Sequence, residues 1–152
     1  MNLVIEKPML GKGSVCEKIM RSLPQWFGIE AAIIQYAKDI EQLPTFVAME
    51  DSKAVGFLTI KQHNQFTAEI YVMGVLPQFH RKGIGSSLIE QAEKFINQNG
   101  IEYLQVKTLG ESHPDKYYAL TRGFYFKMGF KPIEEFSQIW DDIPCLLMVK
   151  AL

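Results

Sequence analysis

The chain has 152 residues, of which 47% are hydrophobic and 22% are charged, and its formal net charge is −1. This length is typical of one domain, and these fractions exclude a disordered or fibrous protein. The near-neutral charge argues against a nucleic-acid partner, because such binders need an excess of Lys and Arg to neutralise phosphates. No apolar run approaches the roughly 20 residues that a membrane-spanning helix requires, so we expect no membrane partner.

The cysteines and the first residues bear on the cellular compartment. Cys16 and Cys145 are the only thiols, which is too few for a disulfide framework and typical of a reducing compartment. The N-terminal residues lack the basic segment and long apolar stretch of a secretory signal. We therefore expect a soluble, cytoplasmic protein with a single domain over residues 1–152.

The N-terminal part of the chain predicts one strand and two helices. Leu3–Lys7 favours a short strand, and Gly13–Arg21 favours a short helix. Apolar residues then recur at spacings of three and four from Ile29 to Leu43, which indicates one buried face of a second helix. Pro44 ends this helix, because the residue before a proline avoids the helical conformation.

Three stretches rich in β-branched and aromatic residues follow, and they are separated by short polar gaps. The gaps suit hairpin turns, so the stretches predict an antiparallel meander. Its strands are Thr45–Glu50, Val55–Gln62 and Thr67–Leu76.

The next segment predicts a helix and a strand that runs parallel to the third strand of the meander. The helix begins near Ile84 and ends at Asn99-Gly100, and the strand is Ile101–Leu109. Because a helix connects it to Thr67–Leu76, this strand forms a strand–helix–strand unit with it, and such units pair in parallel.

The C-terminal part predicts a last helix and two strands. The helix begins near Asp115, whose acidic side chain suits the positive end of a helix, and it ends at Gly129. Its expected buried stripe is Tyr117, Leu120, Phe124 and Met128. The final strands are Phe130–Ser137 and Pro144–Val149. The predicted fold class is therefore α/β, with a mixed sheet and about four helices.

Two glycines, Gly83 and Gly85, lie where a strand gives way to a helix. Glycine lets backbone N–H groups approach a ligand closely, and the unpaired donors of a helix N-terminus suit a phosphate or pyrophosphate. Such an anion would also need cations such as Arg81 or Lys82. The alternative is that the glycines only allow tight packing. The sequence contains neither the P-loop pattern nor the G-x-G-x-x-G dinucleotide pattern.

Two motifs together resemble the GNAT superfamily of N-acetyltransferases. Arg81-Lys82-Gly83-Ile84-Gly85, placed after Val75-Leu76-Pro77, resembles the superfamily motif Gln/Arg-x-x-Gly-x-Gly/Ala at a strand–helix junction. Further along, Phe124-Tyr125-Phe126-Lys127-Met128-Gly129-Phe130 resembles its F-Y-x-x-x-G-F signature. One position departs from the pattern, since His80 stands where the motif has Gln or Arg.

The resemblance implies acetyl-CoA as co-substrate and a GNAT-like, mostly antiparallel sheet with a splayed parallel strand pair. The strands of that pair would be Glu69–Leu76 and Ile101–Leu109, with the pantetheine arm between them. The backbone near Met73 and Val75 would pair with pantetheine and polarise the thioester carbonyl. The pyrophosphate would be held by Arg81, Lys82, Gly83, Ile84, Gly85 and Ser86.

Glu69 is the candidate base. Alkyl amines have a pKa of about 10.4 and are mostly charged at neutral pH, so acetyl transfer benefits from a group that accepts a proton. Strand alternation puts Glu69 on the face of Tyr71, Met73 and Val75 unless a bulge resets the phase. The alternative is a solvated or salt-bridged glutamate at a strand entrance.

Tyr125 is the candidate acid. A tyrosine with a pKa of about 10 is protonated at neutral pH and can donate to a departing thiolate. The resemblance places Tyr125 beside the thioester sulfur. Because it lies one residue beyond the expected buried stripe, its hydroxyl need not be buried with Phe124. The alternative is a tyrosine that only packs at a helix edge.

The acceptor site and metal binding have weaker signals. In this superfamily the early helical region borders the acceptor, and here it contains Trp26, Phe27, Glu30 and Tyr36. Its aromatic rings and Glu30 would suit a cationic amine. His113 is either a lining residue of that pocket or a surface group at a helix start. The three histidines lack metal-ligand spacing, so we expect no metal.

The resulting hypothesis is an N-acetyltransferase that moves an acetyl group from acetyl-CoA directly to a primary amine of a small molecule. A small acceptor is favoured because the chain has no appended recognition domain. The alternatives are a protein (lysine or N-terminal) acetyltransferase and a non-catalytic acyl-CoA-binding module. A homodimer is compatible with the sequence.

Overall fold

The structure is a computed structural model that describes residues 2–152. In chain order the elements are β1 Leu3–Ile5, α1 Gly13–Arg21, α2 Glu30–Ile40, β2 Thr45–Glu50, β3 Lys53–Gln62, β4 Thr67–Val75, a 3-10 helix Pro77–Phe79, α3 Ile84–Gln98, β5 Tyr103–Leu109, α4 Lys116–Lys127, β6 Lys131–Trp140 and β7 Ile143–Ala151. Every predicted helix and strand is present, and only the boundaries move by a few residues. The largest changes are in α2, which ends at Ile40, and in the last two strands, which are longer than expected.

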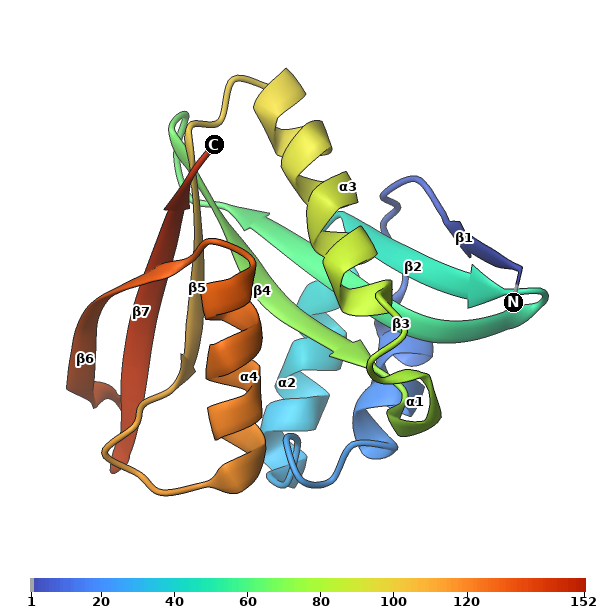
Figure 1. The fold of residues 1–152 in the computed structure, drawn as a ribbon. Coiled ribbons are helices and arrows are strands. Elements are labelled where there is room, and N and C mark those ends of the chain that lie inside the picture. The colour runs from blue at the N-terminus through green and yellow to red at the C-terminus, as the bar shows by residue number, and fades with distance from the viewer. Residues whose placement is uncertain (1) are drawn as a thin grey trace.

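The seven strands form one sheet in the order β1-β2-β3-β4-β5-β7-β6 (Figure 1). Every neighbouring pair is antiparallel except β4 and β5, which run parallel. Helices α3 and α4 lie on one side of the sheet, and α1 and α2 lie on the other (Figure 1). These observations confirm the predicted α/β class with a mixed, mostly antiparallel sheet.

The core lies between the sheet and its helices. The central strand β3 is buried without a break from Val55 to Ile60, because helices cover both of its faces. Helix α3 turns one apolar stripe inward, formed by Ile84, Leu88, Ile89, Ala92 and Ile96. This stripe has the helical spacing that its sequence predicts. Cys16 and Cys145 are both buried and neither forms a disulfide.

The prediction for the inward face of α4 is wrong in part: Phe124 and Met128 pack against the core as expected, but Leu120 does not. Leu120, expected in the buried stripe, is 61% exposed, whereas Tyr125, expected beyond it, is only 6% exposed. The Tyr125 ring packs against Phe124 and Phe130, with each ring centroid 5.6 Å away. The physical reason is that α4 borders a cavity along much of its inner side, so apolar spacing alone does not identify the side chains that are enclosed.

The parallel strands β4 and β5 separate part of the way along their length. They pair only from Thr67 to Ile70 on β4. At the next residue the register with β3 shifts: Ile60 pairs with Ile70 and Thr59 with Val72, so Tyr71 is an extra residue. A bulge of this kind bends a strand and increases its twist. Because β5 stays paired with β7 as far as Leu109, the two strands diverge, which confirms the predicted splayed pair.

Among residues 2–152, no helix has the length and apolar character needed to span a membrane.

Candidate active site

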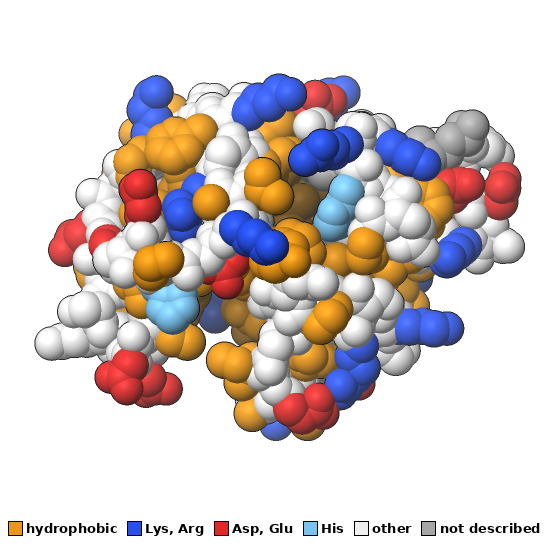
Figure 2. Space-filling view, turned by 60° about the horizontal axis from the view of Figure 1, so that its bottom comes forward, with side chains coloured by type: hydrophobic (Ala, Val, Ile, Leu, Met, Phe, Trp, Pro, Cys, Tyr) orange, Lys and Arg blue, Asp and Glu red, His pale blue; other side chains and the backbone are white. Residues whose placement is uncertain are grey.

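A cavity of about 1500 Å³ extends from the glycine turn before α3 to the gap between β4 and β5. Its walls come from the α1–α2 loop, α2, β4, the start of α3, β5, α4 and the turn between β6 and β7. Figure 2 shows a face of the molecule that is hollowed near its centre, with hydrophobic side chains in the hollow and Lys, Arg and His side chains at its rim. We call this space the larger cavity.

The glycine turn presents backbone donors to the larger cavity. Gly83 is the N-cap residue of α3 and has a φ of 80°, in the left-handed region that glycine adopts without strain. The first helical hydrogen bond to Gly83 comes from Ser87, so the N–H groups of Ile84, Gly85 and Ser86 have no partner inside the helix. All four residues from Gly83 to Ser86 line the larger cavity.

The two basic residues before this turn lie differently. Arg81 lines the larger cavity and has a φ of 61°. The Lys82 ammonium lies 5.3 Å from the ring centroid of Phe79, and Lys82 is not among the residues that line the larger cavity. The structure therefore places Arg81, but not Lys82, with the predicted pyrophosphate site.

Gly85 also has a packing role. A Cβ atom at this position would lie 3.1 Å from Cζ of Phe124, which is closer than ordinary van der Waals contact. The absence of a side chain thus lets α4 approach the start of α3. The position of Gly85 therefore agrees with both interpretations of its role, contact with a ligand and close packing of two helices.

The backbone of β4 beyond the bulge faces the gap. Leu76 donates its N–H to the carbonyl of Val55, which makes Val75 and Gly56 a pair that shares no hydrogen bond. The N–H and C=O groups of Val75 therefore point away from β3. The same holds for Met73, two residues earlier. Both residues line the larger cavity.

His80, the residue that departs from the family motif, connects the glycine loop to the end of β4 through a hydrogen bond. Its Nε2 donates to the carbonyl oxygen of Val75 at 2.6 Å. Its ring also packs edge-on against Trp26, with 5.6 Å between the centroids. Side chain 80 is therefore engaged with the protein itself.

The loop between α1 and α2 is tied to α4. Trp26 Nε1 donates to Thr121 Oγ1 at 2.9 Å, and the Tyr118 hydroxyl donates to the Trp26 carbonyl at 2.7 Å. Burial raises the pKa of Tyr118 to about 12. Trp26 and Phe27 both line the larger cavity, as does His113. Glu30 lies apart from it, because its carboxylate is held by Arg21 at 2.7 and 2.9 Å.

The Tyr125 side chain lies at the larger cavity, and its hydroxyl has no hydrogen-bond partner among residues 2–152. Burial raises its pKa well above the ordinary value of tyrosine, and the nearby Tyr118 and Tyr36 phenols add to the effect. The hydroxyl therefore stays protonated at neutral pH and has its hydrogen available for a ligand.

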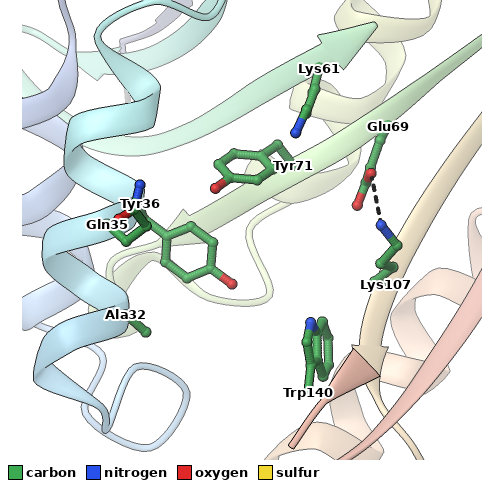
Figure 3. Close-up of a pocket in the computed structure, with 8 residues that line it drawn as sticks. All are labelled: Ala32, Gln35, Tyr36, Lys61, Glu69, Tyr71, Lys107 and Trp140. Carbon is green, nitrogen blue, oxygen red and sulfur yellow. Dashed lines mark hydrogen bonds and ion pairs between the residues drawn. The ribbon is translucent and has the colours of Figure 1, made fainter. Parts of the chain in front are cut away.

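A second, smaller cavity of about 290 Å³ adjoins the larger one (Figure 3). The two cavities share Ala32, Tyr36, Tyr71, Lys107 and Trp140. Only the smaller cavity is lined by Gln35, Lys61 and Glu69. The predicted common face of β4 is thus divided: Glu69 lines only the smaller cavity, Tyr71 lines both, and Met73 and Val75 line only the larger.

Glu69 is enclosed by basic and amide groups. It is 4% exposed, and its Oε1 lies 2.5 Å from His63 Nε2. Lys107 Nζ and Gln105 Nε2 lie 3.4 Å from the same oxygen. The predicted alternative of a salt-bridged glutamate is therefore confirmed in its geometry. The salt bridge does not exclude Glu69 from the candidate active site, because Glu69 also lines the smaller cavity.

Several residues of the smaller cavity and its surroundings were not predicted from the sequence. Lys61 and Gln105 are the direct partners of Glu69 on β3 and β5, and His63 follows in the β3–β4 hairpin. The predicted hairpin could have placed Lys61 opposite Glu69. Trp140 is the last residue of β6, far along the chain, and no local pattern marks it.

The residues described include no group of three or more His, Cys, Asp or Glu side chains placed to hold a metal ion. The groups that line the two cavities include backbone N–H groups, phenols, imidazoles, carboxylates, lysines and the Arg81 guanidinium.

Comparisons with known proteins give a family for this arrangement. A family profile described as an acetyltransferase (GNAT) domain matches residues 41–132. An uncharacterized N-acetyltransferase of Chlorobaculum tepidum is 34% identical over 113 residues, which span 72% of this chain and 63% of that relative.

Solved structures share the fold. An acetyltransferase described as a GNAT family member from Desulfovibrio desulfuricans superposes with a TM-score of 0.86 at 15% identity, over 98% of both chains. A GNAT family acetyltransferase from Elizabethkingia anophelis, with acetyl-CoA bound, gives a TM-score of 0.75 at 18% identity over 99% of both chains. Since the profile matches more than half of the chain and spans β3, β4 and the glycine turn, this chain belongs to the GNAT family of acetyltransferases.

Proposed function

We propose that this protein transfers an acetyl group from acetyl-CoA directly to a primary amine of a small molecule. The observation that carries the proposal is the continuity of the two cavities. The larger one joins the glycine turn to the gap between β4 and β5, and it meets the smaller one at Tyr36, Tyr71 and Trp140. A thioester laid along the gap would end where an amine in the smaller cavity can reach it.

Residues of the larger cavity would hold the co-substrate. The N–H groups of Gly83, Ile84, Gly85 and Ser86 would bind the pyrophosphate at the positive end of α3, with Arg81 adding a charge. Lys82, which lies over Phe79, would contribute only to the local positive potential. The gap-facing backbone of Met73 and Val75 would pair with the pantetheine arm. Val75 would use its N–H, because His80 already occupies its carbonyl.

Two side chains would move protons during the transfer. As the nitrogen–carbon bond forms and the carbon–sulfur bond breaks, Glu69 would accept the proton released by the amine, directly or through water. Tyr125 would donate the proton of its phenol to the departing sulfur. Its raised pKa keeps the phenol protonated, so a hydrogen is available to the developing thiolate, and it also makes the phenol a weaker acid. A backbone N–H of β4 would stabilise the charge that develops on the thioester oxygen.

The size of the smaller cavity supports a small acceptor. Its 290 Å³ lies near the lower end of the roughly 300–1,000 Å³ typical of small-molecule pockets. The single sheet and its one connected core support the proposal that residues 1–152 act as one acetyltransferase domain. Two buried, unpaired thiols support a reducing compartment, for which we propose the cytoplasm.

Two measurements on the whole chain test the function. Calorimetry with acetyl-CoA and CoA should show binding, and thiol release from acetyl-CoA should depend on an added amine. The panel should contain amino acids, polyamines, aminoglycosides and peptides with a free N-terminus or lysine. Turnover only on peptides would favour the protein acetyltransferase, and tight CoA binding without turnover on any amine would favour the non-catalytic module. No affinity for acetyl-CoA at millimolar concentration would refute all three functions.

A further inference from the structure

The smaller cavity has an excess of positive charge. It is lined by Lys61 and Lys107, and Glu69 is its only acidic lining residue (Figure 3). Lys107 lies 3.4 Å from Glu69 and offsets its charge. Lys61 is exposed and forms no ion pair within 4.0 Å among residues 2–152, so its ammonium is available to an anionic group of a ligand.

Other charged groups near the cavity are already occupied. The Asp39 carboxylate accepts hydrogen bonds from the Tyr71 hydroxyl and from Gln35 Nε2, and Asp39 does not line the cavity. His63 contacts Glu69 from outside the cavity and can only add positive charge. Asp39 keeps its negative charge but forms no ion pair with Lys61, so among residues 2–152 the Lys61 ammonium has no carboxylate partner.

We propose that the acceptor is an α-amino acid whose carboxylate is bound by Lys61 and whose amine points toward the junction of the two cavities. This assignment rests on the transferase function proposed above. One lysine without an ion-pair partner matches one carboxylate, whereas a diamine or polyamine would bring further positive charge beside Lys61 and Lys107. Such like charges repel each other in a partly enclosed cavity.

The short distance across the cavity favours an amine on the α-carbon. The Lys61 ammonium lies 5.5 Å from the ring centroid of Tyr71, and Tyr71 lines both cavities. A carboxylate bound to Lys61 is therefore already beside the junction, and an amine on the adjacent carbon reaches it. A long chain between the two groups would carry the amine past the junction.

The walls of the cavity favour an apolar or aromatic side chain on the amino acid. Tyr36 and Tyr71 pack edge to face, with 5.4 Å between their ring centroids, and the Trp140 indole faces them across the cavity (Figure 3). Aromatic walls of this kind bury apolar surface and place few constraints on its shape.

The test compares three acceptors that share a phenyl side chain: phenylalanine, phenylalaninamide and phenethylamine. Thiol release gives kcat/KM for each, expressed per neutral amine because the carboxylate changes the pKa of the amine. We expect phenylalanine to exceed the other two by about 10-fold, as one charge-assisted contact predicts.

Lys61 variants make the test specific. In Lys61→Ala the preference for phenylalanine over phenethylamine should disappear, mainly through a higher KM for phenylalanine. In Lys61→Glu the preference should reverse. Lys53→Ala is the matched control, because Lys53 is an exposed lysine on the same strand that lines neither cavity.

A binding measurement separates this inference from the transferase proposal. Titration of N-acetylphenylalanine into the CoA-saturated protein should give about 10-fold weaker binding to Lys61→Ala than to the wild type. N-acetylphenethylamine should bind both equally. Efficient turnover of phenethylamine or polyamines, with phenylalanine the poorer acceptor, would overturn the assignment and leave the transferase intact. No thiol release with any amine would refute the transferase, and equal binding of N-acetylphenylalanine to both proteins would then refute the Lys61 site as well.

Discussion

The role proposed for Tyr125 predicts that Tyr125→Phe loses turnover without losing stability. The Tyr125 hydroxyl has no hydrogen bond with the described residues, so its removal breaks no bond of the folded protein. We therefore expect the free energy of unfolding to change by less than about 0.5 kcal/mol. Loss of a general acid lowers kcat by about 10²–10⁴, which corresponds to about 3–5 kcal/mol of transition-state stabilisation.

Tyr118→Phe is the matched control on the same helix. The Tyr118 hydroxyl donates to the Trp26 carbonyl at 2.7 Å, so its loss should cost about 1–2 kcal/mol of stability. Because this hydroxyl is committed to Trp26, kcat should stay within a few-fold of the wild type. The two variants should thus show opposite effects on stability and turnover.

Three assays examine the pair of variants: urea unfolding, calorimetric binding of CoA, and thiol release at saturating acetyl-CoA. The affinity of Tyr125→Phe for CoA should be close to that of the wild type. Because burial raises the pKa of Tyr125, the wild-type kcat should also show no decline as pH rises from 9 to 10.5. The reasoning fails if Tyr125→Phe keeps full kcat, or if kcat and CoA affinity fall together.

Three further predictions concern catalysis, packing and pH. Glu69→Gln should lower kcat/KM by about 10²-fold or more, because it removes the proposed base. Glu93→Gln is the control: it removes an ion pair with Lys150 outside both cavities and should leave the rate unchanged. Equal rates for the two variants would exclude Glu69 as the base. Gly13→Ala should lower the free energy of unfolding, measured in urea, by about 1–3 kcal/mol, because its Cβ would lie 2.4 Å from the Ala37 carbonyl oxygen. Gly123→Ala on α4 meets no atom within 4 Å and should stabilise the helix. Burial raises the pKa of Cys16 from 9.0 to about 12, so the folded state holds this proton more tightly than the unfolded state. The stabilisation that comes from protonated Cys16 is complete below pH 9 and is lost as pH rises toward 12. The free energy of unfolding of the wild type should therefore fall more steeply over this window than that of Cys16→Ala. Parallel pH profiles would contradict the raised pKa of Cys16.

Local patterns in the sequence predicted the elements and the glycine turn that lines the larger cavity. Helical spacing in α3, the polar gaps of the meander and the Gly83–Gly85 turn depend on neighbouring residues only, and each is present in the structure. The two motifs also located Tyr125 and the backbone of β4 that faces the gap. These features are set by backbone dihedral preferences and side-chain periodicity, which contiguous residues determine among themselves.

The site around Glu69 could not be predicted in the same way, because it is assembled across the sheet. Lys61, Glu69 and Gln105 meet through the registers of β3, β4 and β5, and Lys107 and Trp140 reach the same cavity from β5 and from the end of β6. The bulge at Tyr71 then sends Glu69 and Met73 to different cavities.

The sequence by itself therefore determined the family, the order of elements and the glycine turn before α3. Only the tertiary structure decided which charges surround the smaller cavity and how deeply Tyr125 is enclosed. The reason is that strand register, the bulge and the packing of α4 depend on contacts between segments distant in the chain, and local sequence patterns do not encode those contacts.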